Sequence, residues 1–254
     1  MSASSPIDTP LADPVAEALR LVASAGKCGL VVRVLGGAAV LLRAPGQRPL
    51  IPREVRDIDI VTPRGAGRAL EQLLPRLGYL PDEMFNALHG ARRQLHVDPV
   101  NHRKLDIFVG AFSMCHEIPI DERLEHEGVT VPPAELLLTK LQIVELNQRD
   151  EHDIYTLCYH HELIDGPGPG IDAVLVADLC ARDWGLWRTA CGTIERCCAD
   201  LPSTELAADA KTLIDARLRG LRERIDAAEK SSRWRRRAWI GERVRWYQQP
   251  EEPE

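Results

Sequence analysis

The chain has 254 residues, 44% of them apolar, which is enough to bury one large hydrophobic core or two smaller ones. Its net charge of −6 gives no overall attraction to nucleic acid. Residues 1–14 lack the apolar core of a signal peptide, and no run approaches the roughly 18 apolar residues of a membrane span. The seven cysteines show no C-x-x-C spacing and are expected to be reduced and mostly buried. We therefore predict a cytoplasmic protein without a membrane segment.

Hydrophobic periodicity divides most of the first half of the chain into alternating helices and strands. In chain order we predict helix 11–25, strand 30–35, helix 38–43, strand 56–61, helix 63–77, strand 94–97 and strand 104–109. The last two strands flank a turn at residues 99–101. This succession is typical of an α/β (α+β) domain with a small mixed sheet.

From Pro132 onward the chain has helical patterns only. The predicted helices cover 134–147, a segment that begins at Asp150, 171–201, 203–229 and 234–246. The Gly- and Pro-rich segment 165–170 is the clearest linker in the sequence. We therefore divide the chain into an α/β domain over residues 1–164 and an all-helical C-terminal region over residues 171–254.

Three aspartates lie within apolar strand patterns. Asp57 and Asp59 belong to strand 56–61, and residues two apart in a strand project from the same face. Asp106 lies in strand 104–109 with similar Leu and Ile neighbours. If the two strands are neighbours, three carboxylates converge on one side of the sheet and repel one another unless a cation compensates. This arrangement suits two magnesium ions and phosphoryl transfer, although a D-x-D pair alone is more often an exposed strand face.

A pair of glycines upstream makes this signal more specific. Gly36 and Gly37 stand between a predicted strand and a predicted helix start at Ala38. Glycine lets the backbone approach a phosphate closely, and a helix N-terminus offers free N–H groups and the positive end of the helix dipole. A Gly-Gly pair is usually only a turn. Followed by an apolar strand with D-x-D, it indicates a nucleotide-binding site.

Gly36-Gly37, Asp57-Ile58-Asp59 and Asp106 together resemble the signature of the DNA polymerase β-type nucleotidyltransferases. That signature is a Gly-Gly or Gly-Ser turn, a strand with D-x-D or D-x-E, and a third acid on a later strand. The resemblance covers roughly residues 31–157. Within the superfamily the chain is most similar to the abortive-infection (AbiEii-type) toxin nucleotidyltransferases and related bacterial proteins.

Those proteins carry a basic residue shortly before the D-x-D, matched here by Arg53 or Arg56. They also carry a helical Lys followed by an acidic cluster, matched by Lys140 and residues 149–153. The resemblance implies that Mg²⁺ or Mn²⁺ binds to Asp57, Asp59 and Asp106. It further implies that a nucleoside triphosphate such as ATP binds to Gly36, Gly37, Arg53, Arg56 and Lys140, with Lys140 also in the catalytic set. The sequence departs from the family at two positions. Ala38 and Val55 stand where many members have Ser or Thr, which affects nucleotide contacts and leaves the acids intact.

Lys140 lies on a largely apolar helical pattern, which leaves two interpretations. It binds the triphosphate as a compact charge, or it extends from a buried helix to solvent. On one continuous helix Asp153 would face away from Lys140, because thirteen residues at 100° each leave about 220°. Asp153 joins the site only if the helix breaks between Asn147 and Asp150. For Asp150 we expect the role of a helix cap.

Residues 211–247 are basic and rich in tryptophan. They hold twelve Lys or Arg against five Asp or Glu, a net charge of +7, which leaves −13 for the rest of a chain of −6. Arginine contacts phosphate and tryptophan stacks on bases, so one interpretation is an RNA- or tRNA-binding surface. Its candidate residues are Arg235, Arg236 and Arg237. The alternative, favoured by the opposite charges of the two parts, is that the tail packs on the acidic body. The packing residues would be Trp234, Trp239 and Trp246.

The predicted reaction joins an acceptor hydroxyl to the nucleotide of a triphosphate and releases pyrophosphate. The acceptor is RNA or tRNA, a protein, or a small molecule as in the aminoglycoside nucleotidyltransferases. The resemblance to a toxin family also predicts a cognate antitoxin as partner. A catalytically silent nucleotidyltransferase-like binding module is the competing hypothesis. The loss of a hydroxyl after Gly37 favours that hypothesis slightly, whereas the three retained acids argue against it.

Overall fold

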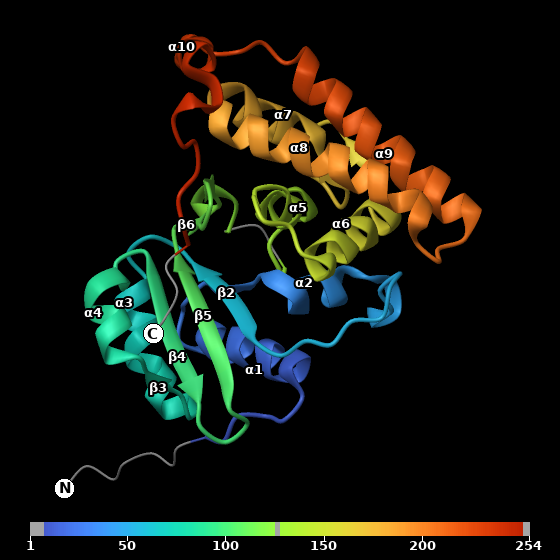
Figure 1. Cartoon of the computed structure of the whole chain (residues 1–254). Helices are drawn as coiled ribbons and strands as arrows, with labels where there is room; N and C mark the ends of the chain where they lie inside the picture. Colours follow the sequence, from blue (N-terminus) through green and yellow to red (C-terminus); the bar gives the residue numbers. More distant parts are fainter. Residues whose placement is uncertain (1–7, 125–127, 251–254) are drawn as a thin grey trace, which may run out of the picture.

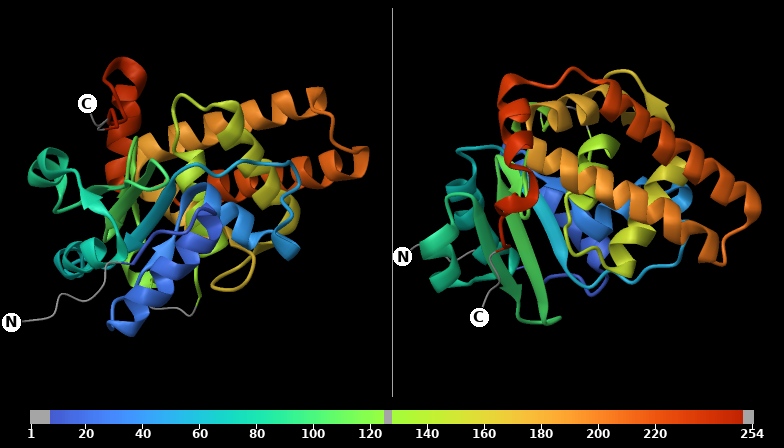
Figure 2. Two further views of the ribbon diagram at one scale, coloured as in Figure 1. Left: turned by 90° about the horizontal axis from the view of Figure 1, so that it is seen from below. Right: turned by 45° about the horizontal axis from the view of Figure 1, so that its top comes forward.

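The computed structural model describes residues 8–124 and 128–250 and is a mixed α/β protein. Figure 1 shows a small sheet formed by the first half of the chain, with helices α1, α3 and α4 around it. The helices from α5 to α10 form a second body above the sheet in this view, and Figure 2 shows them to one side of it. A mixed α/β first half followed by a helical half agrees with the prediction.

The elements have the following bounds. The strands are β1 (Arg33–Val34), β2 (Ile58–Thr62), β3 (Leu80–Pro81), β4 (Arg93–Asp98), β5 (Arg103–Val109), β6 (Ala111–Ser113), β7 (Glu117–Pro119), β8 (Leu163–Ile164) and β9 (Ile171–Asp172). The α-helices are α1 (Pro14–Lys27), α2 (Gly36–Arg43), α3 (Gly67–Leu73), α4 (Glu83–His89), α5 (Pro133–Leu141), α6 (Gln148–His160), α7 (Ala173–Arg182), α8 (Trp184–Asp200), α9 (Ala208–Ala227) and α10 (Ser232–Ile240). Short 3-10 helices include η2 (Leu74–Leu77) and η5 (Gly241–Arg243).

β2 and β5 form the centre of a five-stranded sheet with the order β1-β2-β5-β4-β3. They run parallel to each other, whereas the other neighbouring strands pair antiparallel, so the sheet is mixed. Ile58, Ile60, Leu105 and Ile107 are buried because alternate positions of β2 and β5 project to one covered face. The aspartates between these residues therefore project from the opposite face.

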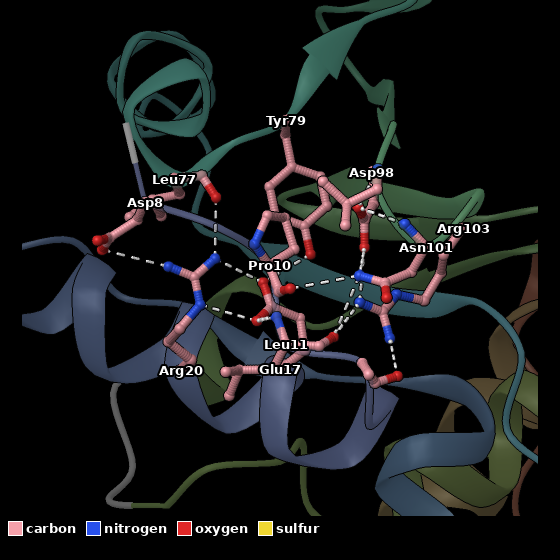
Figure 3. Close-up of polar contacts among 12 residues, drawn as sticks. Asp8, Pro10, Leu11, Glu17, Arg20, Leu77, Tyr79, Asp98, Asn101 and Arg103 are labelled. Carbon is pink, nitrogen blue, oxygen red and sulfur yellow. Dashed lines mark hydrogen bonds and ion pairs between the residues drawn. The ribbon is translucent and has the colours of Figure 1, made fainter. Parts of the chain in front are cut away.

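A buried polar network fixes α1 and the residues before it against the sheet (Figure 3). Glu17 of α1 is fully buried and accepts hydrogen bonds from Tyr79 Oη at 2.8 Å and from Arg20 Nε at 2.7 Å. Arg103 of β5 donates to Asp98 Oδ2 at 2.7 Å. Both buried carboxylates thus have charged or hydroxyl donors, which burial of a charge requires.

The two halves of the chain share a continuous hydrophobic core. Buried residues of the sheet and of the C-terminal helices belong to one cluster, for example Ile60, Leu137, Ile154, Ile194 and Leu218. β8 and β9 pair in parallel on either side of the Gly- and Pro-rich segment, so residues 171–172 form a strand where a helix was predicted. The domain boundary at this segment stays a prediction.

The seven cysteines are free thiols, and all but Cys28 and Cys198 are buried. Burial raises the pKa of the Cys158 thiol to about 12, so this residue packs rather than reacts. In the part of the chain that the structure describes, no helix has both the length and the apolar character needed to span a membrane.

Several predicted helix boundaries were wrong, and three of them bear on the site and the tail. α5 ends at Leu141 instead of continuing to residue 147, because Asn147 caps a new helix by accepting a hydrogen bond from the Asp150 amide at 3.0 Å. Asp150 is therefore the third residue of α6 and not its cap. The last predicted helix, 234–246, ends at Ile240, because Gly241 with φ of 58° leaves the helical conformation.

Candidate active site

Two of the three predicted acids, Asp59 and Asp106, face the same side of the sheet. Asp59 and Asp106 are register partners on the parallel strands β2 and β5, so their side chains project side by side. Asp57 lies two residues before Asp59, immediately before β2 begins, and is exposed. Its Oδ1 accepts a hydrogen bond from the Lys104 amide at 3.3 Å, which connects the start of β2 to β5. Asp59 and Asp106 thus form the centre of the acidic cluster, and Asp57 lies at its edge.

Gly36 brings the first turn of α2 against the Asp59 side chain. Its φ is 58°, and a Cβ at this position would lie 1.9 Å from Asp59 Oδ2, so only glycine fits. The Leu35 amide donates to the Asp59 carbonyl at 2.8 Å, which holds the strand-to-helix junction on β2. Leu35 provides no side-chain cap for α2. The N-terminus of α2 therefore begins at the acidic cluster.

Gly37 contacts a second group of charged residues. A Cβ on Gly37 would lie 2.3 Å from Cζ of Arg53, so the guanidinium lies directly against the α2 backbone. Arg53 forms an ion pair with Asp153, and Lys140 Nζ lies 3.0 Å from the same carboxylate. Lys140 also donates to Asp150 Oδ1 at 2.6 Å. The break between α5 and α6 makes this cluster possible because it turns Asp153 back towards Lys140.

Lys140 does not extend to solvent, since only 8% of it is exposed. Burial lowers the pKa of Lys140, but the carboxylates of Asp153 and Asp150 outweigh this effect, so its pKa is raised and the ammonium stays charged. Arg56 lies elsewhere: it is exposed and pairs with the equally exposed Glu54 at 2.9 Å. Of the two candidate basic residues before the D-x-D, Arg53 is the one beside the glycines.

The Asp59 carboxylate has a raised pKa. Burial raises its pKa to about 6, and the neighbouring charges of Asp106 and Asp57 act in the same direction. Lys140 and Arg53 act in the opposite direction, which means that the basic group lies within electrostatic range of Asp59. A desolvated carboxylate between two others is stabilised by any cation that reaches it.

Arg93 of β4 is a member of the site that sequence reasoning missed. Its Nε lies 2.9 Å from Asp106 Oδ1 and 3.1 Å from Oδ2, and its guanidinium lies 5.4 Å from the ring centroids of Phe85 and Phe108. Arg93 thus supplies the positive charge that Asp106 needs. The sequence contains Arg93 at the start of a strand, but the antiparallel register with β5 that brings it to Asp106 cannot be read from the sequence.

A divalent cation suits the chemistry of this cluster, because Mg²⁺ and Mn²⁺ prefer carboxylate oxygens. Among the described residues, however, no three His, Cys, Asp or Glu side chains are already arranged as a metal-binding group. Asp106 is paired with Arg93, and Asp57 lies at the edge of the acidic cluster. A cation shared by Asp59 and Asp106 would compete with the Arg93 guanidinium for the Asp106 carboxylate.

Two neighbouring cavities lie beside the basic group rather than over the acids. One, of about 130 Å³, is lined by Arg53, Glu54 and Asp153 among others. The second, of about 660 Å³, extends along α6 and the end of α8, and both are lined by Ile51 and Pro52. Both cavities therefore open beside the loop that carries Arg53.

No protein-family model matches this chain, and no curated protein matches it either. The fold is a mixed α/β protein with a small mixed sheet, an architecture that many unrelated functions share. A functional proposal therefore rests on the geometry of the site and on the motif resemblance.

Replacing Arg93 by Gln should destabilise the metal-free protein by about 1–3 kcal/mol, because the Asp106 carboxylate then loses its charged donor. The same variant should show a larger increase in Tm with millimolar Mg²⁺ than the wild type, since the ion no longer competes with a guanidinium. Melts over a Mg²⁺ series measure both effects. Arg92→Gln, which removes an exposed neighbouring charge, is the control. A Mg²⁺ response equal to that of the wild type would contradict competition at Asp106.

Proposed function

We propose that this chain is a metal-dependent nucleotidyltransferase that transfers a nucleotide from a nucleoside triphosphate to an acceptor hydroxyl and releases pyrophosphate. The observation that carries the proposal is the register pairing of Asp59 with Asp106 directly beside the first turn of α2 at Gly36. Carboxylates suited to metal and a glycine-lined helix N-terminus suited to phosphate are then adjacent.

The acidic cluster would hold the metal. Mg²⁺ or Mn²⁺ at Asp57, Asp59 and Asp106 would neutralise the triphosphate and favour deprotonation of the acceptor hydroxyl. Asp106 would take up the acceptor proton. Gly36 and Gly37 would receive the phosphates on backbone N–H groups of α2, next to the Arg53 guanidinium that lies against Gly37.

Arg53 and Lys140 would bind the triphosphate from the other side. Both act electrostatically on Asp59, which supports contact with a triphosphate whose metal ion would be held by that carboxylate. Their carboxylate partners Asp153 and Asp150 fix their position before the nucleotide arrives. Such preorganisation reduces the entropy that binding would otherwise cost.

A catalytically silent nucleotide-binding module is the second candidate. The pairing of Arg93 with Asp106 favours it, because an internal guanidinium takes the position of a cation. Ala38, which provides no hydroxyl after the glycines, also favours the silent module. Both candidates bind nucleotide, and transfer distinguishes them. Membership of the abortive-infection toxin group and a cognate antitoxin remain further proposals that rest on the motif resemblance.

The proposed function is tested by incubating the protein with each α-labelled nucleoside triphosphate, Mg²⁺ or Mn²⁺, and one class of acceptor at a time. The acceptors are total RNA, tRNA, cell protein and a panel of aminoglycosides. We expect label in one class with the wild type and none with Asp106→Asn. A triphosphate that raises the Tm without any transfer would support the silent module. Neither binding nor transfer would contradict both candidates.

A further inference from the structure

A cavity of about 520 Å³ lies between the start of α8 and the C-terminal segment of residues 233–248. Five arginines line it together with three tryptophans and Tyr247, and we call it the arginine–tryptophan pocket. Its arginines are Arg182, Arg233, Arg236, Arg237 and Arg245. α10, which carries three of them, lies beside α7 and α8 and away from the sheet (Figure 1).

Part of the tail is structural and forms the wall of this pocket. Trp246 Nε1 donates to Thr189 Oγ1 of α8 at 3.0 Å, and the Trp246 ring packs edge-on against Trp184 with centroids 6.2 Å apart. Arg237 lies over the Trp184 ring at 4.7 Å and donates to the Gly241 carbonyl at 2.6 Å. The tail therefore packs on α8, and Arg237 is used within the fold.

Three arginines of the pocket remain available to a ligand. Arg233 and Arg236 are exposed, and within residues 8–124 and 128–250 neither side chain has a hydrogen bond or an ion pair. Arg245 is also exposed and lies 5.4 Å from the Tyr247 ring centroid. Three uncompensated guanidinium groups at one cavity form a strong attraction for an anion.

The pocket has almost no acidic charge of its own. Asp183 is the one acid among its described lining residues, against five arginines, and gives a net charge of +4. The Asp183 carboxylate already caps α8 by accepting a hydrogen bond from the Leu186 amide at 2.9 Å. The lining of the pocket therefore carries a net positive charge, although the chain as a whole is acidic.

Trp239 is exposed on the helix that carries these arginines. Its side chain is 89% exposed, so it does not pack on the body as the packing alternative predicted. Trp239 lies three and four residues after Arg236 and Arg235, which places the three on one face of α10. An exposed aromatic ring on an arginine-rich helix is typical of surfaces on which nucleic-acid bases stack.

We propose that the arginine–tryptophan pocket and Trp239 together bind single-stranded nucleic acid. Phosphates would lie on Arg233, Arg236 and Arg245, and a base would stack on Trp239. This deepens the proposed function by naming the class of acceptor, and it rests on the proposed function in that respect alone. Binding is measured without transfer, so failure of one does not imply failure of the other.

A second copy of this chain is the competing occupant, because the part outside residues 211–247 carries a net charge of −13. The exposed Trp239 favours nucleic acid. A surface carboxylate satisfies a guanidinium but offers no planar ring for stacking, whereas a nucleotide offers both a phosphate and a base.

The test is fluorescence anisotropy with a short labelled oligouridylate and the matching oligothymidylate, titrated over a series of salt concentrations. Changing Arg233, Arg236 and Arg245 together to Ala should weaken binding and reduce the slope of log K against log salt by about 2, since each phosphate contact contributes roughly 0.7. Trp239→Ala should weaken binding by at least about fivefold with an unchanged slope. The two oligonucleotides distinguish RNA from DNA as the source of the phosphate.

The matched control changes Lys27, Arg68 and Arg76 to Ala. These exposed residues lie on α1, α3 and η2, and the change removes the same charge. Figure 1 shows α1 and α3 beside the sheet and away from α10. Equal loss of binding in the control, or no binding by the wild type at low salt, would overturn the proposal. So would a dimer in light scattering that the arginine variant loses while no oligonucleotide binds. Trp239→Ala, at an exposed position, keeps the test valid if the triple variant unfolds.

Discussion

Replacing Asp59 by Asn is expected to abolish nucleotidyl transfer and at the same time to stabilise the metal-free protein. Transfer should fall by more than about 100-fold, because changes even in the outer shell of a metal site cost 10- to 100-fold. Stability should increase because burial raises the pKa of Asp59 to about 6 from an ordinary 3.8. At 1.36 kcal/mol for each pH unit, ionising this carboxylate costs the folded state up to about 3 kcal/mol.

The stabilisation by Asp59→Asn should depend on pH. Below about pH 4 the carboxyl is protonated in both the folded and the unfolded chain, so variant and wild type should be equally stable. Between pH 4 and 6 the unfolded chain ionises first, and the wild type loses stability as the pH rises. Above pH 6 the difference should stay constant. Urea denaturation at pH 4, 5, 6 and 7.5 measures it.

Asp57→Asn is the control for burial, because it removes a neighbouring but exposed acid. It should leave the free energy of unfolding nearly unchanged in metal-free buffer. Millimolar Mg²⁺ should increase the Tm of the wild type, and Asp59→Asn should remove most of that increase. A stability difference between wild type and Asp59→Asn that does not grow from pH 4 to 6 would contradict the desolvation of Asp59.

Gly36→Ala should have the second large effect. Its φ of 58° costs a non-glycine residue about 1–2 kcal/mol, and a Cβ there would overlap Asp59 Oδ2. The Asp59 carboxylate must then move, so both stability and transfer should fall, transfer by more than about 100-fold. The change is measured by urea denaturation and by the transfer assay.

Gly29→Ala separates the two causes. Gly29 has a similar φ of 72°, but a Cβ there meets nothing within 4 Å. It should therefore lose only the stability that the backbone conformation costs and retain full transfer. Equal behaviour of the two variants would mean that the close approach of α2 to Asp59 has no role in the site.

The central sheet could be predicted because its pattern is local. Ile58 and Ile60 alternate with Asp57 and Asp59, and a period of two assigns each residue to a face without further information. The prediction assumed that the two strands are neighbours, and the sequence did not itself specify the parallel pairing of β2 with β5. Short elements such as α4 and the β6–β7 hairpin were missed, because a few residues carry too little periodic signal.

The contact of Lys140 with Asp153 depends on a helix break that the sequence pattern did not specify. Lys140 meets Asp153 because α5 ends at Leu141 and Asn147 starts α6. No Gly or Pro marks this break, so periodicity alone extended the helix. Arg93 depended on a register between distant strands, which no local pattern specifies. In the tail, composition did not show which tryptophans pack on the body. The structure shows Trp246 half-buried against α8 and Trp239 exposed.

The most direct test of nucleotidyl transfer follows the two ends of the triphosphate separately. The wild type is incubated with Mg²⁺, the acceptor found in the screen, and a nucleoside triphosphate labelled at either the α- or the γ-phosphate. We predict that the α-label becomes attached to the acceptor and that the γ-label is recovered in pyrophosphate, with neither product formed by Asp59→Asn. Attachment of the γ-label would indicate a kinase, and no attachment of either label with any triphosphate would contradict nucleotidyl transfer.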